Sequence, residues 1–113
     1  MNVEPILKPA LEALGYPVAP DCYDGEADEY IVFNYSDERP TTWVDDVDRY
    51  DLTTVQVHFF TRYSPSEIKP KLRALLRRLG FTILSTDQYY ENDTKYRHVI
   101  VEAEIASEIK EES

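Results

Sequence analysis

The sequence has little of several residue types on which common functions depend. Its 113 residues include one cysteine, Cys22, and three glycines. A single cysteine excludes an intramolecular disulfide and any zinc or iron–sulfur site that needs several thiolates. Gly15, Gly25 and Gly80 stand far apart, so the chain contains no glycine-rich phosphate loop.

Long hydrophobic runs and basic residues are also scarce. No apolar run approaches the roughly 20 residues that a transmembrane helix needs, so we expect no membrane contact. Glu4 and Pro5 stand where a signal peptide would carry basic and apolar residues, so we expect no cleaved signal. The chain has 12 Lys and Arg residues but 22 Asp and Glu residues, which gives a net charge of −10. This charge argues against a protein that wraps duplex DNA.

The size and apolar content suit one domain. Apolar residues make up 42% of the chain, enough for a modest core. We therefore expect a single domain over residues 1–113, with an ordered core at about 3–105 and an acidic, frayed tail at 106–113.

The charges are unevenly distributed. Residues 21–51 contain eleven acids and only two basic residues, a net charge of −9. Five basic residues instead fall within ten positions: Lys69, Lys71, Arg73, Arg77 and Arg78. Opposite patches can attract copies of a protein head to tail. The alternative is that both are solvated surfaces that keep the protein soluble.

Hydrophobic periodicity predicts six elements. The loop at 16–29 is rich in Pro, Asp and Gly, and Pro40 interrupts the strand pattern after Tyr35. The expected elements are a helix at 2–14, strands at 30–35 and 50–63, a helix at 64–79, and strands at 81–90 and 95–105. The order α-β-β-α-β-β predicts an α+β fold: a mostly antiparallel four-stranded sheet with two helices on one face.

Residues with catalytic or metal-binding chemistry are few. His58 and His98 each lie on a predicted strand, where a histidine is more often a sheet residue than a ligand. The run from Asp24 to Asp28 superficially resembles a calcium loop, but its twelfth position is Tyr35 instead of the required Glu. We expect no catalytic site, no cofactor and no resident metal.

Aromatic residues are abundant by comparison. Nine tyrosines and Trp43 include several in loops or at strand ends. Tyrosine and tryptophan are enriched at protein–protein contacts, although they also cover sheet edges and anchor loops. The sequence leaves both interpretations open.

Several phrases together resemble a known family. They are YIVFN at 30–34, the Pro40-x-x-Trp43-x-Asp45-Asp46 loop, VQV at 55–57, LGF at 79–81 and the hairpin around YENDTKYRH at 90–98. Over roughly residues 5–105 the chain resembles the small tail-completion proteins of long-tailed phages and prophages, also called tail terminators or head–tail joining proteins.

The resemblance implies a structural role in the virion, at the head–tail junction, with assembly in the host cytoplasm. Such proteins form a ring, usually a hexamer, that caps the tail tube and meets a head connector protein, while DNA passes through as cargo. Since a channel for DNA should repel phosphates, we expect an acidic lumen. The candidate lumen residues are Asp24, Glu26, Asp28, Asp45, Asp46 and Asp48. The candidate subunit-interface residues are Lys69, Arg73, Arg77 and Trp43.

Other functions stay open at this point. Another head–tail connector or minor capsid component would share the architecture. An acidic binding module, such as an inhibitor that mimics DNA, would suit the acids at 21–51. A small enzyme is the weakest alternative, because no catalytic constellation is present.

Overall fold

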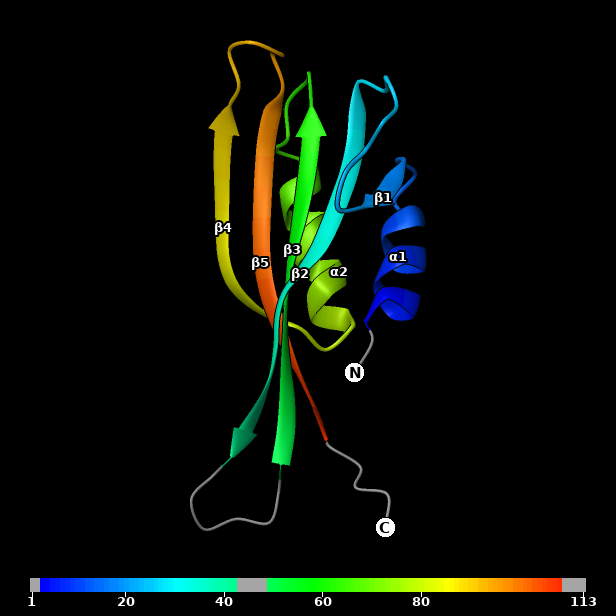
Figure 1. Ribbon diagram of the computed structural model, residues 1–113. Coiled ribbons are helices and arrows are strands. Elements are labelled where there is room, and N and C mark those ends of the chain that lie inside the picture. Colours follow the sequence, from blue (N-terminus) through cyan, green and yellow to red (C-terminus); the bar gives the residue numbers. More distant parts are fainter. Residues whose placement is uncertain (1–2, 43–48, 109–113) are drawn as a thin grey trace.

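The computed structural model describes residues 3–42 and 49–108, with side chains over residues 3–34 and 52–106. The chain folds into two helices and five strands (Figure 1). In order they are α1 (Glu4–Glu12), β1 (Val18–Pro20), β2 (Glu29–Thr42), β3 (Arg49–Thr61), α2 (Ile68–Arg78), β4 (Thr82–Tyr90) and β5 (Arg97–Glu108). None of the described helices is long and apolar enough to cross a membrane.

All five strands belong to one sheet, in the order β1-β2-β3-β5-β4. The short β1 runs parallel to β2, and every other neighbouring pair is antiparallel. The strands β2, β3 and β5 extend well beyond the helices at one end, which gives the molecule a longest dimension of 51 Å (Figure 1). The opposite end gathers the β1–β2 loop, the β3–α2 connection and the β4–β5 loop.

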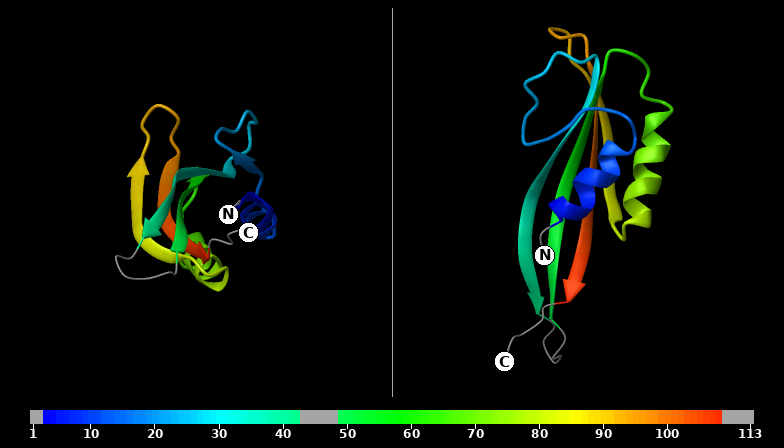
Figure 2. Two further views of the ribbon diagram at one scale, coloured as in Figure 1. Left: turned by 60° about the horizontal axis from the view of Figure 1, so that its bottom comes forward. Right: turned by 90° about the vertical axis from the view of Figure 1, so that its right-hand side faces the viewer.

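Both helices lie on the same face of the sheet (Figure 2). In the described parts of β2, β3 and β5, alternate side chains point to this covered face and are fully buried, as Phe59 and its cross-strand neighbours Ile31 and Val99 show. The helices contribute apolar stripes, with Leu7 and Leu11 from α1 and a second stripe from α2. The α2 stripe consists of Ile68, Leu72, Leu75 and Leu76. Burial of these side chains in one core is the main stabilising contribution to the fold.

The α+β class and the two helices on one face are confirmed, but the predicted four-stranded sheet is wrong. The sheet has a fifth strand, β1, inside the segment expected to be a loop. The strand has only three residues and ends in a proline, so the sequence contains no hydrophobic alternation that could predict it. Its pairing with Ile31 to Phe33 on β2 defines it instead.

The second correction concerns β2, which continues past Tyr35 to Thr42. A register shift between Tyr35 and Asp37 absorbs one residue, and Pro40 then pairs with Asp51 on β3. Beyond Phe33, β2 has β3 as its one neighbour, because β1 ends there. Proline is tolerated on such an edge, where one side of the strand needs no N–H donor.

The segment around α2 also differs at its start. The helix begins at Ile68, after Glu67 and without a side-chain cap, instead of at the expected residue 64. The hydroxyl groups of Ser64 and Ser66 are hydrogen-bonded to each other, with their oxygens 2.8 Å apart. Gly80 closes the helix with a φ of 100°, the left-handed conformation that glycine adopts without strain. Of the tail expected to fray, residues 109–113 lie outside the described residues.

Candidate functional site

An acidic loop, residues 21–28, connects β1 to β2 at the end of the sheet where the loops gather. The ring of Tyr23 stacks on Tyr30, with centroids 4.3 Å apart, and its hydroxyl accepts a hydrogen bond from the Ala27 N–H. A Cβ at Gly25 would overlap the Tyr23 hydroxyl, so the loop needs glycine there to fold over the ring. This packing leaves the Asp24 and Glu26 side chains exposed.

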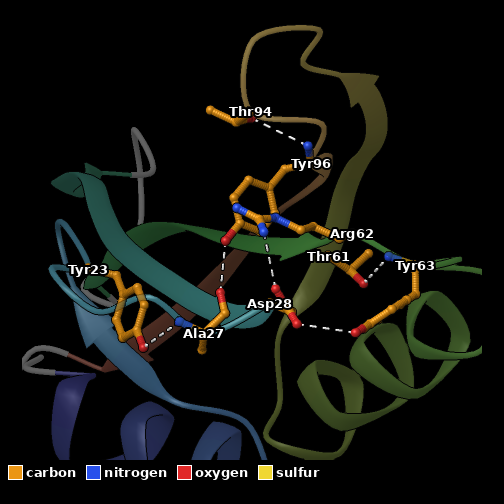
Figure 3. Close-up of polar contacts among 8 residues, drawn as sticks. All are labelled: Tyr23, Ala27, Asp28, Thr61, Arg62, Tyr63, Thr94 and Tyr96. Atoms are coloured by element: carbon orange, nitrogen blue, oxygen red, sulfur yellow. Dashed lines mark hydrogen bonds and ion pairs between the residues drawn. The ribbon is translucent and has the colours of Figure 1, made fainter.

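A cluster of four side chains fixes the base of this loop to the neighbouring strands (Figure 3). We call it the clasp: Asp28, Arg62, Tyr63 and Tyr96. Arg62 forms an ion pair with Asp28 at 3.3 Å, and the Tyr63 hydroxyl donates to the other carboxylate oxygen at 3.2 Å. The Tyr96 hydroxyl donates to the carbonyl of Ala27 at 2.8 Å. The clasp therefore joins the acidic loop to the end of β3 and to the β4–β5 loop.

The electrostatics of the clasp favour this arrangement. The Arg62 guanidinium lies 4.7 Å from the centroid of the Tyr96 ring, a cation–π contact. The hydrogen bond from Tyr63 to Asp28, together with the carboxylate's charge, raises the pKa of the Tyr63 hydroxyl. Tyr63 thus stays protonated as a donor to Asp28 at neutral pH.

A basic groove of about 610 Å³ lies between the start of α2 and the strands β4 and β5. Its three cationic side chains come from two elements: Lys69 and Arg73 from α2, and Arg97 from β5. The remaining wall is formed by Tyr63, Ser64, Pro65, Ser66, Pro70 and Gln88.

The cations of the basic groove have few partners. Arg97 donates to the backbone carbonyl of Tyr63 at 3.0 Å and lies over the ring of Tyr90. The Nε of Arg73 is buried without a hydrogen-bond partner. Within the described part of the chain, no carboxylate pairs with Lys69, Arg73 or Arg97. An anion could therefore bind in the groove without displacing an existing ion pair.

The face of the sheet away from the helices carries an aromatic row. Cross-strand pairing aligns Tyr30, Phe60, His98 and Tyr89 on β2, β3, β5 and β4. Tyr30 stacks on Phe60 at 4.7 Å and Phe60 on His98 at 4.0 Å. A cavity of about 380 Å³ opens beside this row, between it and the acidic loop.

The two histidines contact each other on this uncovered face. His58 Nδ1 and His98 Nε2 are 2.7 Å apart, and His58 Nε2 is 3.2 Å from the Gln56 Oε1. The Gln56 amide in turn donates to Glu102. With the Gln56 carbonyl oxygen as acceptor, His58 donates from Nε2, and when both rings are neutral His98 Nε2 donates to His58 Nδ1. Burial lowers the pKa of each histidine, and the charge of His98 lowers that of His58 further.

The structure brings only part of the predicted interface together. Lys69 and Arg73 line the same groove, whereas Arg77 is exposed outside its lining. Arg97 is a groove residue that the sequence did not indicate. Trp43 lies outside the described residues.

The predicted lumen residues separate into three groups. Asp24 and Glu26 are exposed in the acidic loop, while Asp28 is bound in the clasp. Asp45, Asp46 and Asp48 lie outside the described residues. Their assignment to a lumen stays a prediction. Among the residues that the structure describes, no group of three or more His, Cys, Asp or Glu side chains could hold a metal ion.

Comparisons with known proteins find a related fold and no related sequence. Neither the known protein families nor the curated proteins contain a match to this chain. A solved structure, "Virion of native gene transfer agent (GTA) particle", contains a chain with a similar fold, at a TM-score of 0.58 and 12% sequence identity. The similarity covers 88% of this chain and 84% of that one, so it extends over the whole architecture.

Proposed function

We propose that this protein is a non-enzymatic structural component of a phage or prophage virion. The observation that carries the proposal is the fold shared with a chain of the gene transfer agent virion, over 88% of the sequence. The sequence segments that resemble tail-completion proteins also support this proposal.

Within the virion, we propose tail completion at the head–tail junction. A hexameric ring of this chain would cap the tail tube protein and receive the head connector protein, with DNA as passing cargo. The net charge of −10 supports a channel that repels phosphates. The acids between Asp21 and Asp51 are the proposed source of that lumen.

The surface charges support self-association. One end of the molecule displays both an exposed acidic loop and a basic groove whose cations pair with no carboxylate among the described residues. Two different patches of opposite sign favour a heterologous contact, and a heterologous contact that closes on itself produces a ring.

Native mass spectrometry of the purified protein, over a range of concentration and salt, tests the ring. A single closed oligomer with a central hole in negative-stain images is expected. Because each subunit carries net negative charge, added salt should favour the oligomer. A protein that stays monomeric at every condition, and that also fails to cap purified tail tubes, would contradict tail completion.

A further inference from the structure

The basic groove and the start of the acidic loop belong to opposite edges of the same sheet, while the base of the loop reaches the groove wall, where Tyr63 donates to Asp28. The loop follows β1, which is one edge strand, and the groove lies against β4, which is the other. Both are at the end of the molecule where the loops gather, and Figure 2 shows α2 and the β1–β2 loop on opposite sides of that end. Copies placed side by side in one direction would therefore bring the loop of one next to the groove of the next.

We propose that the basic groove binds the acidic loop of a second copy of this chain, with Asp24 and Glu26 as the carboxylates that enter it. The inference rests on the proposed function, which requires contacts between copies, and names the residues that make them. It moves Asp24 and Glu26 from the proposed lumen to the contact between subunits, where Lys69, Arg73 and Arg97 neutralise them.

The chemistry of the groove favours carboxylates on a short protruding loop. Guanidinium groups form paired hydrogen bonds with carboxylates, and the buried Arg73 Nε has a donor to satisfy. The loop presents its acids rigidly, because Tyr23 stacks on Tyr30 and the clasp holds Asp28. A rigid loop loses little conformational entropy on binding.

Duplex DNA is a poorer occupant. Three cations confined between a helix and a strand contact few phosphates, and the chain as a whole, at a net charge of −10, repels a polyanion. The acidic loop, by contrast, is part of the protein itself, so every second copy of the chain supplies carboxylates for the groove.

The position of the single cysteine allows a direct test. Cys22 is exposed and belongs to the acidic loop, next to Asp21. Ser66 is exposed and lines the groove, so a cysteine there reports on the approach of a neighbour's loop. The double variant Cys22→Ser/Ser66→Cys has one thiol, in the groove, and wild type has one thiol, in the loop.

One of the two proteins is ¹⁵N-labelled, because exchanging Cys and Ser leaves their masses equal. The proteins are mixed and oxidised with glutathione disulfide, and the mixed disulfide dimer is measured by intact mass. The matched control is Cys22→Ser/Lys71→Cys, with its thiol on an exposed α2 position outside the groove. We expect about tenfold more mixed dimer with Cys at 66 than at 71, because docking raises the effective concentration of the two thiols.

Charge reversal identifies the groups responsible. Adding Lys69→Glu to the groove partner should remove the preference, and adding Glu26→Lys to the loop partner should then restore it. Lys71→Glu, the same charge change outside the groove, should leave the yield of mixed dimer through position 66 unchanged. Circular dichroism checks that each variant is folded. Glu26→Lys should disturb the fold least, because Glu26 is exposed.

Equal yields at positions 66 and 71 would overturn the inference. If the same protein still formed closed rings, the proposed function would stand and a different surface would join the subunits. Protection of the thiol at 66 by short duplex DNA, without a preference for the mixed dimer, would assign the groove to phosphates and also overturn it.

Discussion

Phe59 and Phe60 are neighbours on β3, yet they belong to the two faces of the sheet, which differ in almost every property. Phe59 is 1% exposed beneath the helices, in a mostly aliphatic core, with the ring of Tyr16 edge-on to it. Phe60 is only partly buried, in a row with Tyr30 and His98 that no helix covers. The strand's period of two produces this contrast. The covered face holds the fold together, whereas the other face keeps aromatic and titratable groups accessible.

The largest expected difference between the faces is in stability. Phe59→Ala removes a buried ring from the core and should lower the free energy of unfolding by about 3–5 kcal/mol. Phe60→Ala removes a partly solvated ring and should cost clearly less, about 1–2 kcal/mol for lost stacking and burial. Urea denaturation of the two variants measures both values. Equal losses would contradict the contrast between the faces.

A smaller effect is expected in the clasp. Tyr96→Phe keeps the buried ring and removes the hydroxyl that donates to the Ala27 carbonyl, which should cost about 1 kcal/mol. Thermal unfolding of this variant measures the loss. Tyr63→Phe is the control for an exposed hydroxyl and should change stability less.

The histidines of the uncovered face should make stability depend on pH. Their pKa values are lowered in the folded state. Below about pH 6.5 these histidines therefore bind protons in the unfolded chain more readily than in the folded chain. Their contribution is fully present above that pH and decreases as the pH falls toward the folded-state pKa values. Denaturation at pH 7.5 and pH 5.5 should show a smaller drop for His58→Gln than for wild type. An identical drop in both proteins would show that the pair does not titrate in this range.

The smallest effect is expected for the exposed ion pair. Arg62 and Asp28 are each 49% exposed, and solvent screens such pairs, so Arg62→Gln should cost at most about 1 kcal/mol, including its stacking on Tyr96. Unfolding at low and high salt separates the contributions, since salt weakens the ion pair more than the stacking. A loss as large as that of Phe59→Ala would mean that the clasp, and not the core, dominates the fold.

Local sequence patterns predicted the elements whose signal is strong. The leucine stripe of α2 repeats over several turns, so the sequence predicted a helix at 64–79, and its Ile68, Leu72 and Leu76 are buried in the core. The short β1 has no such repeat. The extension of β2 through Pro40 depends on its position at an edge of the sheet, which only the strand order reveals.

The candidate surfaces were predictable only in part, for a related reason. Lys69 and Arg73 are one helical turn apart, so the sequence places them together. Arg97 reaches the same groove because β5 pairs with β3, opposite Thr61, and that pairing joins residues distant in the chain. The clasp likewise brings Tyr96 to Ala27 across 69 positions, a contact that no local pattern encodes.

The most direct test of the virion assignment is to locate the protein in particles. Gold-labelled antibody against this chain would be applied to tailed particles released from cells that carry its gene, and imaged by electron microscopy. A virion component of the proposed kind predicts label at the head–tail junction of intact particles. Purified particles without label, with the protein left in the soluble lysate, would contradict the assignment.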